Sequence, residues 1–141
     1  MILALLAILI VGPVMPDHAL TPGVTRPLTT QQVCGTKWGK DRRAVTLAMR
    51  KQVFAEYRVP YEKHALYEVD HLISRELGGA DDIQNLWPQP WTGAWNAYQK
   101  DRLENYLHRQ VCSGAMTLER AQTAIRGDWR VSFRAAFGDP R

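Results

Sequence analysis

The chain has 141 residues, which corresponds to about one domain. Its composition is 45% hydrophobic and 23% charged, which is typical of a packed globular domain and excludes a collagen-like, coiled-coil or wholly disordered chain. The formal net charge of +4 is compatible with a polyanionic partner. No apolar run approaches the roughly 20 residues that a membrane span requires.

The first residues have the character of a targeting segment. The apolar run from Ile2 to Val11 has the length of a signal-peptide core, and Pro13 and Pro16 follow it. Prolines at these positions disfavour a buried helix or strand. We therefore expect residues 1–19 to be a signal-like segment that exports the protein to the periplasm or the extracellular space, rather than a retained membrane anchor.

The two cysteines, Cys34 and Cys112, are too few for a disulfide-framework miniprotein and lack the C-x-x-C spacing of a zinc knuckle. An exported protein meets an oxidising compartment, so we predict a disulfide between them. The alternative is two separate buried thiols, and the sequence alone does not decide between the two.

Prolines and threonines are frequent in residues 20–32, which predicts an extended linker ahead of a domain over residues 33–141. Within that domain, Asp41 is placed to cap a helix that runs to about Tyr57. Pro60 stops any continuation of this helix.

Basic residues are concentrated in the first part of this domain. Between positions 37 and 51, Asp41 is the one acidic residue, and the basic residues are Lys37, Lys40, Arg42, Arg43, Arg50 and Lys51. Such a cluster can bind the phosphates of a nucleic acid, with Arg42 and Arg43 as candidate contacts, or it can be a solvated helix face. The sequence leaves both interpretations open.

Two short strands are expected in the middle of the chain. Residues 66–73 predict a strand, which Gly78 and Gly79 end. After a polar loop, a second strand starts at Leu86, and the prolines at positions 88 and 90 close it.

Three helices are expected after the strands. The first runs from about Gly93 to Val111, Thr117 is placed to cap the second, and Asp128 is placed to cap the third. The resulting order of helix, two strands and three helices predicts an α+β fold that is mostly helical.

A carboxylate stands beside an imidazole near the end of the first expected strand, at Asp70 and His71. Successive side chains of a strand point to opposite sides, so both can serve one point only if the strand ends or bends there. In that arrangement Asp70 can hold a hard cation while His71 stays free as a base. Asn85 can fix the tautomer of the imidazole. The alternative for this pair is a surface turn.

Three segments together resemble the HNH endonucleases: Tyr67–Ile73, Leu77–Gly79 and Asn85–Gln89. The spacing from His71 to Asn85 is one that this family favours. The segments Lys100–Asn105 and Cys112–Gly114 are similar to those of small, often exported bacterial HNH proteins, and the resemblance covers residues 33–130.

The resemblance implies a ββα-metal motif flanked by helices, in which two short strands, a loop and a helix surround one divalent cation. By resemblance, His71 corresponds to the general base, Asp70 to a metal ligand and Asn85 to the residue that orients the base. The cation implied is Mg²⁺ or Mn²⁺, with Zn²⁺ or Ni²⁺ as alternatives. It would polarise the scissile phosphate and stabilise the leaving 3′ oxygen.

The chain departs from the family pattern at the start of the expected helix. Many members have a second ligand there, His or Asn, whereas no histidine stands at the start of this helix, which begins Gly93-Ala94-Trp95-Asn96. Asn96 is the candidate second ligand, or simply a residue at the N-terminus of the helix. Tyr98 is an alternative occupant of the ligand position and a poor ligand for Mg²⁺.

Further basic and aromatic residues lie near these motifs. Arg75, Lys100 and Arg102 can contact phosphate groups, or they can form salt bridges with the neighbouring Glu76, Asp101 or Glu104. Three tryptophans can either stack on unpaired bases or belong to the core: Trp87, Trp91 and Trp95.

From the sequence we expect an exported, single-domain, metal-dependent HNH endonuclease that hydrolyses phosphodiester bonds, with DNA favoured over RNA as its partner. One alternative is a weak or inactive nucleic-acid-binding module of the same fold. Another is an exported envelope interaction protein held together by its disulfide. The oligomeric state is not indicated by the sequence.

Overall fold

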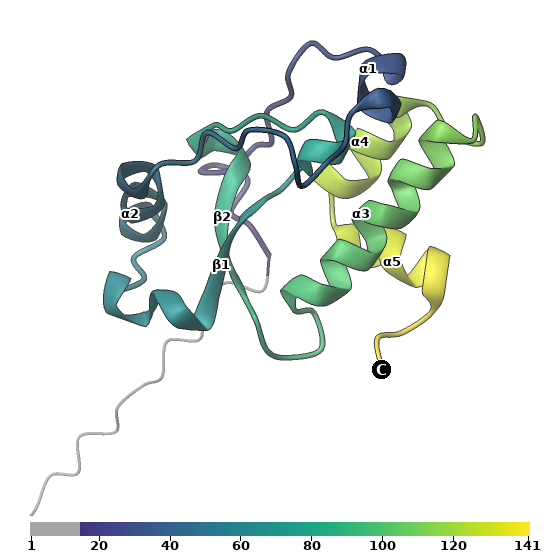
Figure 1. Ribbon diagram of the computed structural model, residues 1–141. Helices are drawn as coiled ribbons and strands as arrows, with labels where there is room; N and C mark the ends of the chain where they lie inside the picture. The colour runs from purple at the N-terminus through teal and green to yellow at the C-terminus, as the bar shows by residue number, and fades with distance from the viewer. Residues whose placement is uncertain (1–14) are drawn as a thin grey trace, which may run out of the picture.

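The computed structural model describes residues 15–141, and the apolar run from Ile2 to Val11 lies outside the described residues. Helices surround a small two-stranded sheet, so the fold is of the expected α+β class. In Figure 1 the sheet stands between α2 (Leu47–Glu56) on one side and α3 (Ala97–Cys112) on the other. Within residues 15–141, no helix is both long enough and apolar enough to cross a membrane.

The sheet is an antiparallel pair of β1 (Tyr67–His71) and β2 (Leu86–Pro90). Tyr67 pairs with Pro90 and His71 with Leu86, so the end of β1 lies beside the start of β2. The prolines expected to close the second strand are part of it. Proline is tolerated because each strand of a two-stranded sheet has a free edge.

The connection between the strands contains two short 3-10 helices, η2 (Arg75–Leu77) and η3 (Ile83–Asn85). Gly79 lies between them at a position that no other residue can occupy without a shift of the backbone. A Cβ placed on it would lie 1.7 Å from the carbonyl oxygen of Ile73. The absence of a side chain therefore lets the loop fold back against the end of β1.

The helix α2 begins later than the sequence predicts. Thr46, not Asp41, caps it, through a hydrogen bond that the Met49 N–H donates to the threonine hydroxyl at 3.2 Å. Asp41 instead forms an ion pair with Arg75. Asp41 thus joins the loop before α2 to the loop after β1, and this long-range pairing replaces the expected local cap.

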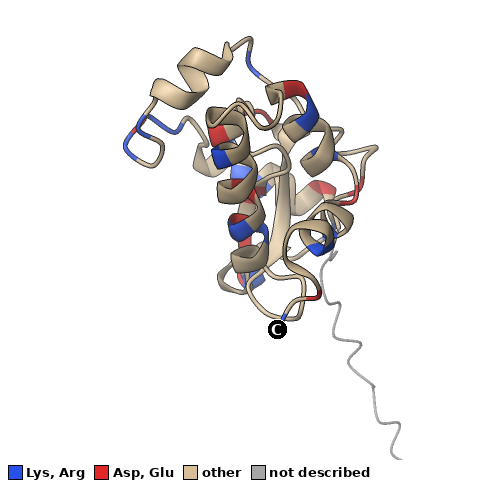
Figure 2. Cartoon of the chain, turned by 90° about the vertical axis from the view of Figure 1, so that its right-hand side faces the viewer, with Lys and Arg blue, Asp and Glu red and all other residues tan. Residues whose placement is uncertain are grey.

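The C-terminal helices are α3, α4 (Leu118–Arg126) and α5 (Trp129–Phe137), and Thr117 and Asp128 cap α4 and α5 as expected. Helix α3 starts at Ala97 rather than near Gly93, because Asn96 caps it. These helices share a buried core with the chain that follows β1: Ile73, Leu77, Leu103, Leu107, Val111, Ala121, Ile125, Trp129 and Phe133. Acidic and basic residues are interspersed over this helical side of the molecule (Figure 2).

A second, smaller core joins α2 and η1 (Tyr61–Leu66) to the opposite side of the sheet. Its buried members are Val53, Phe54, Val59, Tyr67, Val69 and Leu86. The strand β1 therefore lies between two apolar clusters, which fixes the position of the polar residues at its end.

The predicted disulfide between Cys34 and Cys112 is confirmed, with a Cα–Cα distance of 5.6 Å. It ties α1 (Thr30–Gly35) to the last residue of α3. The chain that precedes α1 is extended and packs on the loop between the strands. Thr21 is buried and donates to the Leu86 carbonyl at 2.9 Å, and Thr25 forms a β-bridge with Gly79.

Candidate active site at the end of β1

A cavity of about 200 Å³ lies at the end of β1, and we call it the central cavity. Asp70 and His71 both line it, although they are consecutive residues. A regular strand would point them to opposite sides. The strand ends at His71, which allows both side chains to reach one cavity.

His71 is 4% exposed, and its Nε2 lies 2.8 Å from Oδ1 of Asp81. A carboxylate only accepts hydrogen bonds, so Nε2 bears the proton and Nδ1 is the acceptor of the ring. Arg43 Nη2 lies 3.4 Å from Nδ1. Burial lowers the pKa of His71 to about 4, more than the nearby carboxylates Asp70 and Asp81 raise it, so the ring is neutral at neutral pH.

Asp81 is held in place from several sides. The Ala44 N–H donates to its Oδ2 at 2.6 Å, and Arg75 Nε lies 3.1 Å from its Oδ1. Partial burial acts to raise the pKa of Asp81, but these donors and His71 outweigh burial and leave the pKa below its ordinary value. Asp81 is therefore a fixed anion that orients the imidazole.

A buried lysine neutralises part of the acidic side of the central cavity. The side chain of Lys100 in α3 is fully buried, and its Nζ lies 2.8 Å from Asp70 Oδ2. The ammonium also pairs with Glu104 and donates to the His71 carbonyl at 2.6 Å. Burial alone would lower the pKa of Lys100, but Asp70 and Glu104 raise it above its ordinary value, so the lysine remains charged.

The oxygen ligands for a divalent cation would come from Glu68 and Asp70, which occupy alternate positions of β1 and therefore share one face. Burial raises the pKa of Glu68 to about 7, with further contributions from Asp70 and Asp101. Glu68 Oε2 is buried and has no hydrogen-bond partner. An unpaired carboxylate oxygen beside other carboxylates suits Mg²⁺ or Mn²⁺, so these residues fit the implied metal.

Asn85 is fully buried, and its carboxamide bonds to the backbone. Its Oδ1 accepts from the Ile73 N–H at 3.0 Å, and its Nδ2 donates to the carbonyls of Ile73 and Ala80, each at 3.0 Å. Both amide hydrogens are used in these contacts. Asn85 therefore acts on His71 by fixing the loop that bears Asp81, whereas the sequence predicted that it orients the imidazole itself.

Asn96 does not line the central cavity. Its Oδ1 accepts from the Gln99 N–H at 3.1 Å, and its Nδ2 donates to the Gly93 carbonyl at 2.9 Å. The structure thus gives Asn96 the role of a helix cap, one of the two alternatives that the sequence left open. Tyr98, the other candidate for the ligand position, is 62% exposed.

The basic candidates fall into different environments. Arg43 and Arg75 line the central cavity, and Arg42 lines a neighbouring one. Arg75 pairs with Asp41 and Asp81, not with the acidic residues that the sequence suggested. Arg102 lies elsewhere: its guanidinium is 4.8 Å from the centre of the Phe137 ring.

The three tryptophans for which the sequence left a stacking platform or a place in the core open are dispersed. Trp87 is fully buried, and Trp95 packs against Trp129 with ring centroids 5.5 Å apart. Trp91 lines a further cavity of about 200 Å³. The core interpretation therefore holds for Trp87 and Trp95.

Sequence reasoning missed several residues in and beside the central cavity. Asp81 does not line the cavity but contacts His71, and the sequence placed it only in a polar loop. Glu68 lines the cavity and was part of the motif without an assigned role. Trp38 lines the cavity and was not considered. The one local signal for Asp81 was its position shortly after the pair Gly78 and Gly79. A loop that folds back at Gly79 brings Asp81 to the end of β1, beside His71.

A second group of potential ligands lies at the disulfide. The ligand atoms of Cys34, His108 and Cys112 lie within 4.8 Å of one another, and by distance such a group could hold a metal ion. Metal binding requires thiolates, whereas these sulfurs are joined in the disulfide. The identity of any such metal is not indicated.

No protein-family model matches the chain, and neither a curated protein nor a solved structure matches it. Function must therefore be inferred from the chemistry of the site.

Proposed function

We propose that this protein is a metal-dependent HNH-type endonuclease that hydrolyses phosphodiester bonds of nucleic acids, with His71 as the general base. The observation that supports this most strongly is the contact of His71 with Asp81. It holds the proton on Nε2 and keeps Nδ1 unprotonated as an acceptor, which Arg43 Nη2 faces at 3.4 Å, in a cavity that also contains the carboxylates of Glu68 and Asp70. In this proposal β1, β2 and α3 form the ββα-metal motif.

In the proposed reaction, the attacking water replaces Arg43 Nη2 as the hydrogen-bond partner of His71 Nδ1, and Nδ1 takes a proton from this water. Asp81 stabilises the imidazolium that forms, and Arg75 keeps Asp81 in position. Removal of the proton by a positioned base accelerates such a reaction by typically about 10²–10⁴-fold.

Glu68 and Asp70 would hold the divalent cation. When bound, the cation supplies Lewis-acid polarisation of the phosphate and stabilises the leaving oxygen. The ammonium of Lys100 has three partners in the interior, which hold the lysine side chain in place. Its contact with Asp70 in turn fixes the rotamer of that carboxylate.

The test is a cleavage assay with plasmid DNA and with RNA, in Mg²⁺, in Mn²⁺ and in chelator. His71→Ala is expected to lower the rate by roughly 10²–10⁴-fold without loss of metal binding. Asp70→Ala should lower cleavage and calorimetric metal binding together. Arg130→Ala, which breaks an ion pair with Asp128 outside the cavity, is the matched control. A His71→Ala variant that cleaves as fast as the parent would contradict the mechanism.

A second candidate function is nucleic-acid binding without hydrolysis. Lys100 favours it, since its ammonium already neutralises Asp70 and Glu104. Binding of nucleic acid in chelator, together with no cleavage under any divalent metal, would support this alternative. For both candidates we propose export, which agrees with the disulfide because such bonds persist in oxidising compartments.

A further inference from the structure

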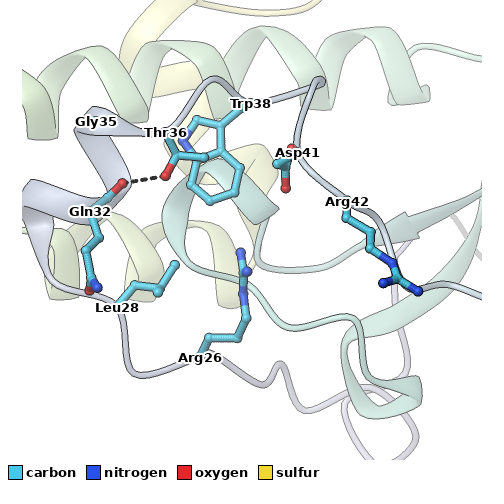
Figure 3. A pocket seen from close by; sticks show the side chains of 8 residues that line it. All are labelled: Arg26, Leu28, Gln32, Gly35, Thr36, Trp38, Asp41 and Arg42. Atoms are coloured by element: carbon cyan, nitrogen blue, oxygen red, sulfur yellow. Dashed lines mark hydrogen bonds between the residues drawn. The ribbon is translucent and has the colours of Figure 1, made fainter.

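Two cavities flank the central cavity and share residues with it. One has a volume of about 540 Å³ and is lined by Arg26, Trp38 and Arg42, and we call it the tryptophan cavity (Figure 3). It shares Trp38 and Asp41 with the central cavity. Arg26 comes from the chain before α1, and Trp38 and Arg42 come from the loop after it. Because two of its lining residues also line the central cavity, the tryptophan cavity lies beside the end of β1.

The other flanking cavity is lined by Arg50, Tyr61 and Trp91, and we call it the tyrosine cavity. Its volume is about 200 Å³, and it shares Arg43 and Glu68 with the central cavity. The central cavity therefore lies between two cavities that each contain aromatic and arginine side chains.

We propose that the three cavities form one track for an unpaired polynucleotide strand, DNA or RNA, with the scissile phosphate in the central cavity. The placement of the scissile phosphate rests on the proposed function. Strand binding itself does not, because the flanking cavities provide the contacts. A strand bound along this track would contact the tryptophan cavity on one side of the scissile phosphate and the tyrosine cavity on the other.

The charges favour this ligand. Arginines line all three cavities, but carboxylates outnumber them in the central cavity, whereas arginines outnumber carboxylates in each flanking cavity. Phosphates bind to guanidinium groups and are repelled by carboxylates unless a cation lies between them. A polyanion would therefore gain its affinity at the two flanks and present one phosphate at the centre.

The tryptophan cavity has an unused donor. Arg26 Nη2 is buried and has no hydrogen-bond partner, while Arg26 Nε donates to the Gly79 carbonyl at 3.3 Å. Figure 3 shows Arg26 and Trp38 pointing toward one another, and the guanidinium lies 5.6 Å from the ring centroid. Trp38 is fixed because its Nε1–H donates to the Val33 carbonyl at 2.8 Å. A rigid ring beside an unpaired donor suits one nucleotide, with its base on the ring and its phosphate on the arginine.

The tyrosine cavity also contains aromatic rings. Tyr61 and His64 are stacked, with ring centroids 4.9 Å apart and an interplanar angle of 14°. Trp91 lines the same cavity, and Arg50 adds a positive charge. Bases in a duplex have their faces covered by their neighbours, so aromatic side chains on both flanks indicate an unpaired strand.

The proposal is tested by fluorescence anisotropy of labelled oligonucleotides with the full chain, in chelator so that metal-dependent cleavage does not interfere. The ligands are one sequence as single-stranded DNA, as single-stranded RNA and as duplex DNA. We expect both single strands to bind more tightly than the duplex, and the DNA and RNA arms show which sugar is preferred. Equal or tighter binding of the duplex would overturn the proposal.

Variants separate the two flanks. Trp38→Leu is expected to weaken single-strand binding roughly 5- to 100-fold, the range that loss of one base–aromatic stack produces. Trp38→Phe loses the same indole hydrogen bond but retains a ring, and should recover most of the affinity. Arg26→Ala and Arg50→Ala should each lower the salt slope of the affinity by up to about 0.7. Arg130→Ala removes the same charge outside the three cavities and should leave the slope unchanged.

The outcomes distinguish this proposal from the proposed function. Trp38-dependent binding of single strands without cleavage in any metal would support the track and contradict the nuclease. Cleavage with unchanged affinity in Trp38→Leu and Arg50→Ala would support the nuclease and overturn the track. Absence of single-strand binding would also overturn the track.

Discussion

Lys100 Nζ lies 2.8 Å from Asp70 Oδ2 in the interior of the protein, where the lysine side chain has no exposed surface. The ammonium also pairs with Glu104, so one cation serves two carboxylates. Removal of one partner from a buried ion pair leaves an uncompensated charge and typically costs about 3–5 kcal/mol.

Lys100→Met is therefore expected to lower the free energy of unfolding by about 3–5 kcal/mol, measured by urea denaturation in chelator. Lys40→Met, at an exposed position, is the control and should change stability little. Unchanged stability of Lys100→Met would mean that Asp70 and Glu104 do not need this cation in the folded state.

Asn85→Ala is expected to destabilise the loop between the strands. The substitution leaves the Ile73 N–H and the carbonyls of Ile73 and Ala80 without the partners that they have in the interior. Each buried group left unpaired costs about 1–3 kcal/mol. Urea denaturation measures the loss, with Asn105→Ala, whose amide bonds at the surface, as control. Cleavage should fall as well, because Asp81 loses its position beside His71, and full activity in a destabilised variant would contradict this.

The titration of His71 should appear in the stability of the metal-free protein. Burial lowers its pKa from 6.5 to about 4, so between these values the unfolded chain binds a proton that the folded protein does not bind. The free energy of unfolding should therefore decrease as the pH falls from 6.5 to 4, by about 3 kcal/mol from this residue. His71→Gln should remove this part of the pH dependence, and the exposed His18→Gln should retain it. A His71→Gln profile parallel to that of the parent would contradict the prediction.

The disulfide should contribute substantially to stability. It closes a loop with a sequence separation of 78 residues, for which the chain-entropy model gives about 4–5 kcal/mol. Addition of a dithiol reductant should lower the urea midpoint of the parent. A Cys34→Ser, Cys112→Ser double variant should show the lower midpoint with or without reductant. A midpoint of the parent that does not respond to reductant would refute the prediction.

Much of the secondary structure could be predicted because its signals are local. Thr117 and Asp128 cap helices that begin directly after them, and each needs only the next three residues to do so. Asp41 has the same local chemistry but no helix follows it immediately. Its carboxylate finds Arg75 instead, and a partner so distant in sequence cannot be deduced from capping preferences.

Part of the central cavity could be predicted from the sequence, namely the residues at the end of β1. Asp70 and His71 follow each other at a strand end, and the sequence indicates both their chemistry and the condition under which they can cooperate. The contact from His71 to Asp81 depends on the path of the intervening loop, and the buried Lys100 depends on how α3 packs against β1. These are tertiary relationships, so composition and spacing do not determine them.

Gly79 contributes no reactive group, yet its lack of a side chain permits the close approach to the Ile73 carbonyl that returns the chain to Asp81. Even alanine at this position would force the backbone apart, and the anion would move away from the imidazole that it orients. The backbone fold therefore excludes a side chain at Gly79, although this residue does not line the central cavity. A related chain that has lost this glycine would be expected to have lost the pairing of its histidine as well, even with every ionisable residue of the cavity retained.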